Sequence, residues 1–254
     1  MFSVVFFVLG ATAASFMGLL TARLARGAPW VMGRSHCDTC KAPLPPRALV
    51  PIFSWAFARG RCVLCNAAVS PASTITEIIL GVLFVLAYLL LGLTEMLPAV
   101  LIALALLAGL VIYDLAHGLL PAALLGLFVA AACFAAITAS ATLEILLVTL
   151  CTALLIGSSL AVVHLASRGR AMGLADAPLA FGLALIAGPS ALSGFVLTFW
   201  IGGVVGIILL ALRARGVTIQ SEVPFAPYLA AGFLLAYFTR WDILALVSLA
   251  LSGA

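Results

Sequence analysis

Long, unbroken apolar segments make up most of the chain, and short polar turns separate them except for one polar stretch between Arg23 and Thr74. The segments are rich in Leu and Ala and do not alternate with polar residues, which favours helices over a membrane barrel. At roughly 20 apolar residues per crossing, the pattern predicts about eight transmembrane helices. They are expected at about 2–22, 75–92, 97–113, 120–139, 143–166, 177–190, 191–212 and 225–239. The stretch Ile243 to Leu251 should extend the last helix or lie in the membrane interface.

The composition places the chain outside the soluble classes of protein. It is 66% hydrophobic and 8% charged, with a mean hydropathy of +1.34, whereas soluble domains carry roughly 25% charged residues. Because backbone groups in lipid must be satisfied internally, we expect an all-α polytopic membrane protein whose main partner is the lipid bilayer. Its net charge of +4 is explained by membrane topology, and no nucleic-acid partner is expected.

The basic residues predict the orientation of the helices. Cytoplasmic loops carry an excess of Lys and Arg. In a count of eight helices that starts outside, almost all basic residues fall on one side, and only Arg240 falls on the other. The residues on the common side are Arg23, Arg26, Arg34, Lys41, Arg47, Arg59, Arg61, Arg168, Arg170, Arg213 and Arg215. This side should be the cytoplasm, with the first helix retained in the membrane.

Two aspartates lie at ends of predicted helices, where charge is costly and a functional role is the default expectation. Asp114 ends the third helix and Asp176 opens the sixth, so both are expected near the cytoplasmic interface. Two carboxyl groups in apolar surroundings can share one proton and activate a water for attack on a carbonyl. Three alternatives stay open: interfacial charges, a helix N-cap at Asp176, and a proton or ion pathway.

Four of the six cysteines form two C-x-x-C pairs in the polar stretch. The pairs Cys37/Cys40 and Cys62/Cys65 have a spacing close to that of zinc ribbons, and a closed Cys₄ zinc site is the favoured interpretation. We therefore expect a small cytoplasmic zinc-binding loop at 27–73, within an N-terminal region 1–92 that precedes a membrane domain 93–254. The alternative is a redox-active dithiol, but that role would need only one of the two cysteine pairs.

Three further features carry weaker predictions. Gly202 and Gly206 form a G-x-x-x-G that is typical of close helix packing. Glu77, at the start of a predicted helix, should interact favourably with the helix dipole. Cys133 and Cys151 lie within apolar helices, where cysteines usually serve packing.

Several separated motifs, in order, resemble the bacterial type IV prepilin peptidase family (prepilin leader peptidase/N-methyltransferase). The matching segments are Ala14–Met17 through Arg23-Leu24, Arg34–Cys37, Gly60–Cys62, Thr76-Glu77 through Gly81, Tyr113–Leu115 through His117, Leu120-Pro121 and Val223–Pro227. The resemblance implies an intramembrane aspartic protease of the inner membrane with Asp114 and Asp176 as its catalytic residues. It also implies cleavage, on the cytoplasmic side, of the leader of type IV prepilins or type II secretion pseudopilins, with a metal-binding tetrad at Cys37, Cys40, Cys62 and Cys65. Many members then methylate the new N-terminus with S-adenosylmethionine.

The second catalytic motif departs from the family pattern. The family usually has G-x-G-D followed by a lysine two residues later, whereas this chain has Gly173-Leu174-Ala175-Asp176 and then Pro178. An alanine restricts the backbone more than a glycine does, and a proline removes an N–H donor. The departures motivate an alternative function, a catalytically impaired relative that acts as a membrane assembly or substrate-binding factor.

Overall fold

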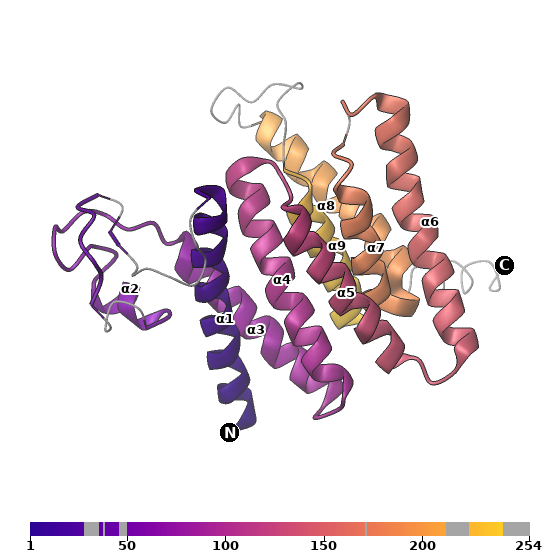
Figure 1. Ribbon diagram of the computed structural model, residues 1–254, viewed down its shortest axis with the longest axis horizontal. Coiled ribbons are helices and arrows are strands. Elements are labelled where there is room, and N and C mark those ends of the chain that lie inside the picture. Colours follow the sequence, from indigo (N-terminus) through magenta and orange to yellow (C-terminus); the bar gives the residue numbers. More distant parts are fainter. Residues whose placement is uncertain (28–35, 38, 46–49, 171, 212–223, 241–254) are drawn as a thin grey trace. The chain divides into compact units, whose positions relative to one another are not determined.

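The computed structural model describes residues 1–27, 36–37, 39–45, 50–170, 172–211 and 224–240 (Figure 1). Within these ranges every regular element is a helix, and the only β-pairing consists of two isolated bridges. The helices are α1 (Phe2–Ala25), α2 (Phe53–Phe57), α3 (Ala72–Leu91), α4 (Met96–His117), α5 (Ala122–Ala139), α6 (Leu143–Ser167), α7 (Asp176–Ala187), the 3₁₀ turn η2 (Gly188–Ser190), α8 (Ala191–Ala211) and α9 (Ala226–Thr239). The predicted all-α fold is confirmed, and each predicted membrane segment has a matching helix.

Six segments of the described chain are long and apolar enough to cross a membrane. They are α1, α3, α4, α5, α6 and the combined segment Asp176–Ile208, which contains α7, η2 and most of α8. The chain is thus a multi-pass membrane protein. Gly188, with φ 55°, ends α7 after 12 residues, which is a length of about 18 Å at 1.5 Å per residue. The stretch Ile243 to Leu251 lies outside the described residues, as do Arg34, Arg47, Arg213 and Arg215.

The described residues form two compact units. The first contains 1–93 and the part of α4 at 104–112, and the second contains 94–103 and the residues from 113 onward. The predicted division into functional regions 1–92 and 93–254 stays a prediction. In the first unit α1 and α3 contact each other closely, because a Cβ added at Gly10 would lie 2.6 Å from the carbonyl oxygen of Leu80.

The polar loop of the first unit is anchored to α3 by Glu77. This side chain is 5% exposed, and its Oε2 accepts a hydrogen bond from the N–H of Ile52 at 2.7 Å. Ile52 has φ 64°, a strained conformation for a β-branched residue. The predicted dipole role of Glu77 is wrong, because α3 begins at Ala72 and the residue therefore lies beyond the first turn.

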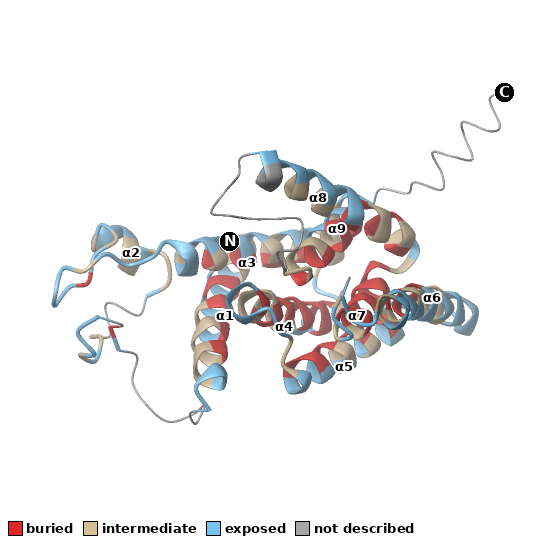
Figure 2. Ribbon diagram, turned by 90° about the horizontal axis from the view of Figure 1, so that it is seen from above, coloured by how far each residue is buried: buried red, intermediate tan, exposed pale blue. Residues whose placement is uncertain are grey.

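In the second unit α7 is enclosed by neighbouring helices, and ten of its residues are buried (Figure 2). Small residues allow this enclosure. A Cβ at Gly182 would meet the Phe128 ring of α5 at 2.6 Å, and one at Gly157 of α6 would lie 3.2 Å from the Ala177 carbonyl oxygen. The start of α7, and with it Asp176, is therefore held by contacts along the whole helix.

The G-x-x-x-G prediction is corrected by the packing of α8. Gly202 makes only ordinary contacts with Tyr228, and no described atom lies within 4 Å of a Cβ added at Gly206. The close contact between α8 and α9 occurs instead at Gly194 and Gly232. The packing role predicted for Cys151 is also wrong, because its side chain is exposed. A sequence motif shows which positions permit close approach, and the fold decides which of them a neighbour uses.

Candidate functional site

Asp114 lies in the last turn of α4, and its carboxyl group caps another helix. The residue is 6% exposed, and its Oδ2 accepts a hydrogen bond from the backbone N–H of Ala226 at 3.1 Å. Ala226 is the first residue of α9, so this N–H has no partner within its own helix. The positive end of the α9 dipole therefore faces the Asp114 carboxyl group.

Asp176 is the first residue of α7 and is 7% exposed. Its Oδ2 accepts a hydrogen bond from the N–H of Gly173 at 3.1 Å. Ala175 is the N-cap residue, so the N-cap alternative for Asp176 is wrong. Asp176 instead fixes the turn that leads into α7.

The two carboxyl groups lie within range of each other's charge, and Asp176 also interacts electrostatically with His164. Asp114 and Asp176 thus come from different helices of the same unit and are brought together. Two buried acids that interact in this way hold one negative charge at lower cost than two, which is the state that acid–base catalysis by a carboxyl pair requires.

The backbone around Asp176 explains how the chain accommodates its two departures from the family motif. Ala175 has φ −68° and ψ −16°, an ordinary conformation for any residue. Pro178 lies in the first turn of α7, where an N–H has no obligatory helical partner. The Leu174 carbonyl oxygen accepts a hydrogen bond from the N–H of Ala177 at 3.3 Å. Neither substitution therefore strains the turn.

Two groups near the acids are missed by sequence reasoning. His164 belongs to the last turn of α6, and its Nδ1 lies 2.8 Å from the Met172 carbonyl oxygen. The N–H of Ala226 belongs to the backbone, so the type of residue at this position does not reveal its role. The Pro224–Pro227 part of the last family motif does mark the start of α9, whereas Val223 lies outside the described residues.

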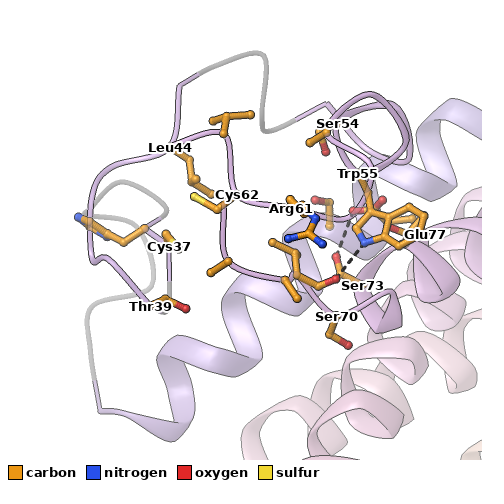
Figure 3. Close-up of a pocket in the computed structure, with 18 residues that line it drawn as sticks. Cys37, Thr39, Leu44, Ser54, Trp55, Arg61, Cys62, Ser70, Ser73 and Glu77 are labelled. Carbon is orange, nitrogen blue, oxygen red and sulfur yellow. Dashed lines mark hydrogen bonds between the residues drawn. The ribbon is translucent and has the colours of Figure 1, made fainter. Parts of the chain in front are cut away.

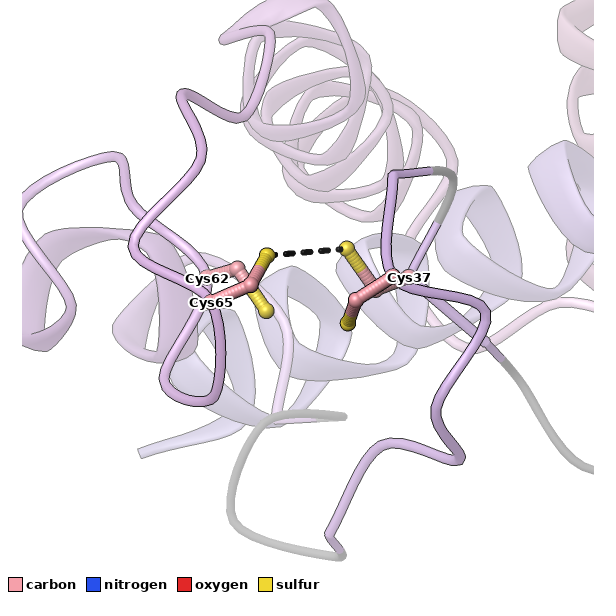
Figure 4. A group of neighbouring side chains, drawn as sticks. Cys37, Cys62 and Cys65 are labelled. Atoms are coloured by element: carbon pink, nitrogen blue, oxygen red, sulfur yellow. Dashed lines mark hydrogen bonds between the residues drawn. The ribbon is translucent and has the colours of Figure 1, made fainter.

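The four loop cysteines gather in one cluster, as predicted. Their sulfur atoms all lie within 4.8 Å of one another. Each pair belongs to a turn of the same form: Cys37 and Cys62 donate their N–H groups to the carbonyls five residues later, at 3.0 and 2.8 Å. Their own carbonyls accept from Lys41 and Asn66, which both have positive φ. Two equivalent knuckles therefore face each other (Figure 4).

The cluster has the dimensions and the chemistry of a tetrahedral metal site. Zn–S bonds of about 2.3 Å in a tetrahedron separate sulfur atoms by about 3.8 Å. Cys37 Sγ and Cys65 Sγ are 3.8 Å apart (Figure 4). Hydrogen bonds from the backbone of Cys40 and Thr39 lower the pKa of Cys37 to about 6. The four thiols thus fit a zinc ion, which binds thiolates.

Cys65 illustrates why four clustered thiols favour a cation. The Ala67 backbone hydrogen bond lowers its pKa, but burial and the neighbouring thiols raise it more, to about 11. One thiolate therefore opposes ionisation of the next, and a divalent ion removes this opposition because it neutralises their charges.

A cavity of about 570 Å³ lies beside the cysteine cluster in the first unit (Figure 3). Its lining includes His36, Arg61, Ser73 and Glu77. Trp55 borders it and donates from Nε1 to the Val69 carbonyl at 3.1 Å. The Trp55 ring also packs against Gly60, where φ is 68° and a Cβ would lie 3.0 Å from the ring. The second knuckle, α2 and Glu77 thus form one connected structure.

Comparisons with known proteins match the N-terminal third of the chain to a family model and most of its length to individual relatives. A family model described as Bacterial Peptidase A24 N-terminal domain matches residues 8–91. The prepilin leader peptidase/N-methyltransferase of Bacillus subtilis (strain 168) is 28% identical over 92% of this chain and 92% of its own length. The chain is similar to prepilin peptidases over most of its length.

Two other relatives with related names are also similar to this chain. The type 4 prepilin-like proteins leader peptide-processing enzyme of Escherichia coli O78:H11 (strain H10407 / ETEC) is 29% identical over 82% of this chain and 76% of its own. The prepilin leader peptidase/N-methyltransferase of Myxococcus xanthus (strain DK1622) is 33% identical over 48% of this chain, a match that spans 36% of that relative. No solved structure matches the chain.

Proposed function

We propose that this chain is an intramembrane aspartic endopeptidase that removes the leader peptide from type IV prepilins or type II secretion pseudopilins at the cytoplasmic side of the inner membrane. The observation that carries the proposal is the convergence of Asp114 and Asp176, two buried acids on different helices that interact electrostatically. The names of the family relatives supply the substrate class.

The chemistry follows from two acids that share one proton. The ionised carboxylate takes a proton from a water as the water oxygen attacks the scissile carbonyl, while the protonated acid donates a hydrogen bond to that carbonyl oxygen. The tetrahedral intermediate then collapses as a proton passes to the leaving amine and the C–N bond breaks. The hydrogen bonds from Ala226 and Gly173 hold one oxygen of each carboxyl group in place during these transfers.

The basic residues support the cytoplasmic side. Arg168 and Arg170 lie in the loop between α6 and α7, the same loop that ends at Asp176, and Arg59 and Arg61 lie in the loop of the cysteine cluster. Loops with such an excess of basic residues stay in the cytoplasm. A substrate helix in the bilayer would present its scissile bond near the cytoplasmic interface, at the membrane depth proposed for Asp114 and Asp176.

The experiment co-expresses the chain with a prepilin and measures the mature N-terminus by mass spectrometry. Asp114→Asn and Asp176→Asn should each lower cleavage by about 10²- to 10⁴-fold, the contribution of a general acid or base, with membrane insertion unchanged. Glu95→Gln is a matched control, because Glu95 is an exposed carboxylate at the opposite end of α4. Cleavage that survives in either Asn variant refutes the role of that acid. An uncleaved prepilin with the parent chain favours the assembly or substrate-binding alternative.

The same spectrum tests a second activity. Two of the relatives carry N-methyltransferase in their names, and on this ground we propose that the chain methylates the new N-terminus with S-adenosylmethionine as methyl donor. A mature substrate one methyl group heavier than the cleaved peptide is the expected result. A mature substrate without the methyl group contradicts this second activity and leaves the peptidase intact.

A further inference from the structure

The loop between α6 and α7 contains a hydrogen-bonded path that ends on Asp176. His164 Nδ1 lies 2.8 Å from the carbonyl oxygen of Met172, and the N–H of Gly173 lies 3.1 Å from Asp176 Oδ2. The Met172 carbonyl and the Gly173 N–H are the two ends of one peptide group. A single planar unit therefore connects the histidine ring to the carboxyl group.

The direction of each hydrogen bond follows from the groups themselves. A carbonyl oxygen only accepts, so His164 must carry a proton on Nδ1 and donate it. The Gly173 N–H then donates to Asp176. Hydrogen bonds at both ends of one peptide polarise it in the same sense, and each strengthens the other. His164 and Asp176 also interact electrostatically.

The backbone after α6 is shaped to close this path. Arg168 and Gly169 have φ 53° and 76°, and the N–H of Gly169 returns to the His164 carbonyl at 2.8 Å. A Cβ at Gly169 would lie 3.3 Å from the His164 ring, in a conformation that only glycine adopts without strain. This tight reversal brings Met172 back to the imidazole of the helix that the chain has just left.

We propose that His164 is a positioning residue that acts on Asp176 through the Met172–Gly173 peptide group. The inference rests on the proposed function. The imidazole fixes the orientation of the peptide, the peptide fixes Oδ2 of Asp176, and the carboxyl group is thereby aimed at the position of the reacting water. A residue of this kind affects turnover more than substrate binding, because it stabilises the geometry of the reacting groups.

Two nearly isosteric variants separate the hydrogen bond from the bulk of the side chain. In His164→Asn the side-chain amide nitrogen is bonded to Cγ, as Nδ1 is in histidine, so the variant keeps an N–H donor at this position. In His164→Leu a methyl group takes the same position, so the side chain branches in the same way as asparagine but has no donor. We expect kcat to fall about 10- to 100-fold in His164→Leu, the effect of a small misplacement of a catalytic group, with KM nearly unchanged. His164→Asn should stay within about threefold of the parent, since it keeps the donor.

A second measurement needs no substrate and so distinguishes a failure of this inference from a failure of the proposed function. Hydrogen–deuterium exchange of the full chain in detergent should show the amide of Gly173 exchanging at least about tenfold faster in His164→Leu, and at the parental rate in His164→Asn. Equal exchange in the two variants overturns the inference, whether or not the parent cleaves a prepilin. If the parent does cleave, an equal kcat in the two variants overturns it as well.

Discussion

The contact between α8 and α9 gives a prediction whose magnitude follows from its interatomic distances. In Gly232→Ala the new Cβ would lie 2.5 Å from the backbone nitrogen of Thr198 and 2.7 Å from the carbonyl oxygen of Gly194, and it would also overlap Thr198 Oγ1. Ordinary contacts begin at about 3.5 Å, so the helices must separate by about 1 Å. Backbone atoms cannot rotate away, as the end of a side chain could.

This separation has an energetic and a functional consequence. Overpacking costs about 1–3 kcal/mol, and alanine returns about 0.5–1 kcal/mol because it favours a helix more than glycine does. We therefore expect a net loss of about 1–2 kcal/mol. The Ala226 N–H, six residues earlier on α9, would also move, and its 3.1 Å hydrogen bond to Asp114 would exceed the length of a normal bond.

The assay is thermal unfolding of the purified protein in detergent, followed by tryptophan fluorescence, together with prepilin cleavage. Gly203→Ala is the matched control, because Gly203 lies on α8, is exposed, and would have no described atom within 4 Å of its Cβ. It should be neutral or slightly stabilising. If Gly232→Ala unfolds at the same temperature as Gly203→Ala or above it, the packing argument is refuted.

Two further predictions concern the loop of the first unit. Elemental analysis of the purified protein should find one zinc per chain, lost in the double variant Cys37→Ser/Cys62→Ser and kept in Cys133→Ser/Cys151→Ser; parent protein without zinc would refute the site. Glu77→Ala should weaken the anchor to Ile52 by about 1.5–3 kcal/mol, the contribution of a hydrogen bond to a charged group, and limited trypsin digestion should then cut faster after the loop arginines. Digestion at the parental rate would show that Glu77 does not hold the loop.

The sequence by itself determined the helices and the composition of the cysteine cluster. Long apolar segments that do not alternate with polar residues form helices in lipid, because a helix satisfies its backbone groups within the segment. The two C-x-x-C turns are equally local, since each closes its hydrogen bonds within five residues of its first cysteine. The sequence also placed Asp114 and Asp176 at helix ends, because each lies where an apolar segment ends or begins.

The tertiary structure decided what those groups contact. Asp114 meets an N–H that lies 112 residues away, and no local pattern specifies a partner at that separation. Glu77 looked like a helix-dipole residue, but its partner is Ile52 in the loop. No described atom lies within 4 Å of a Cβ added at Gly206 of the G-x-x-x-G motif, whereas a Cβ at the isolated Gly232 would overlap backbone atoms of α8. Residue type sets what a position can do, and the neighbours that folding brings to it decide what it does.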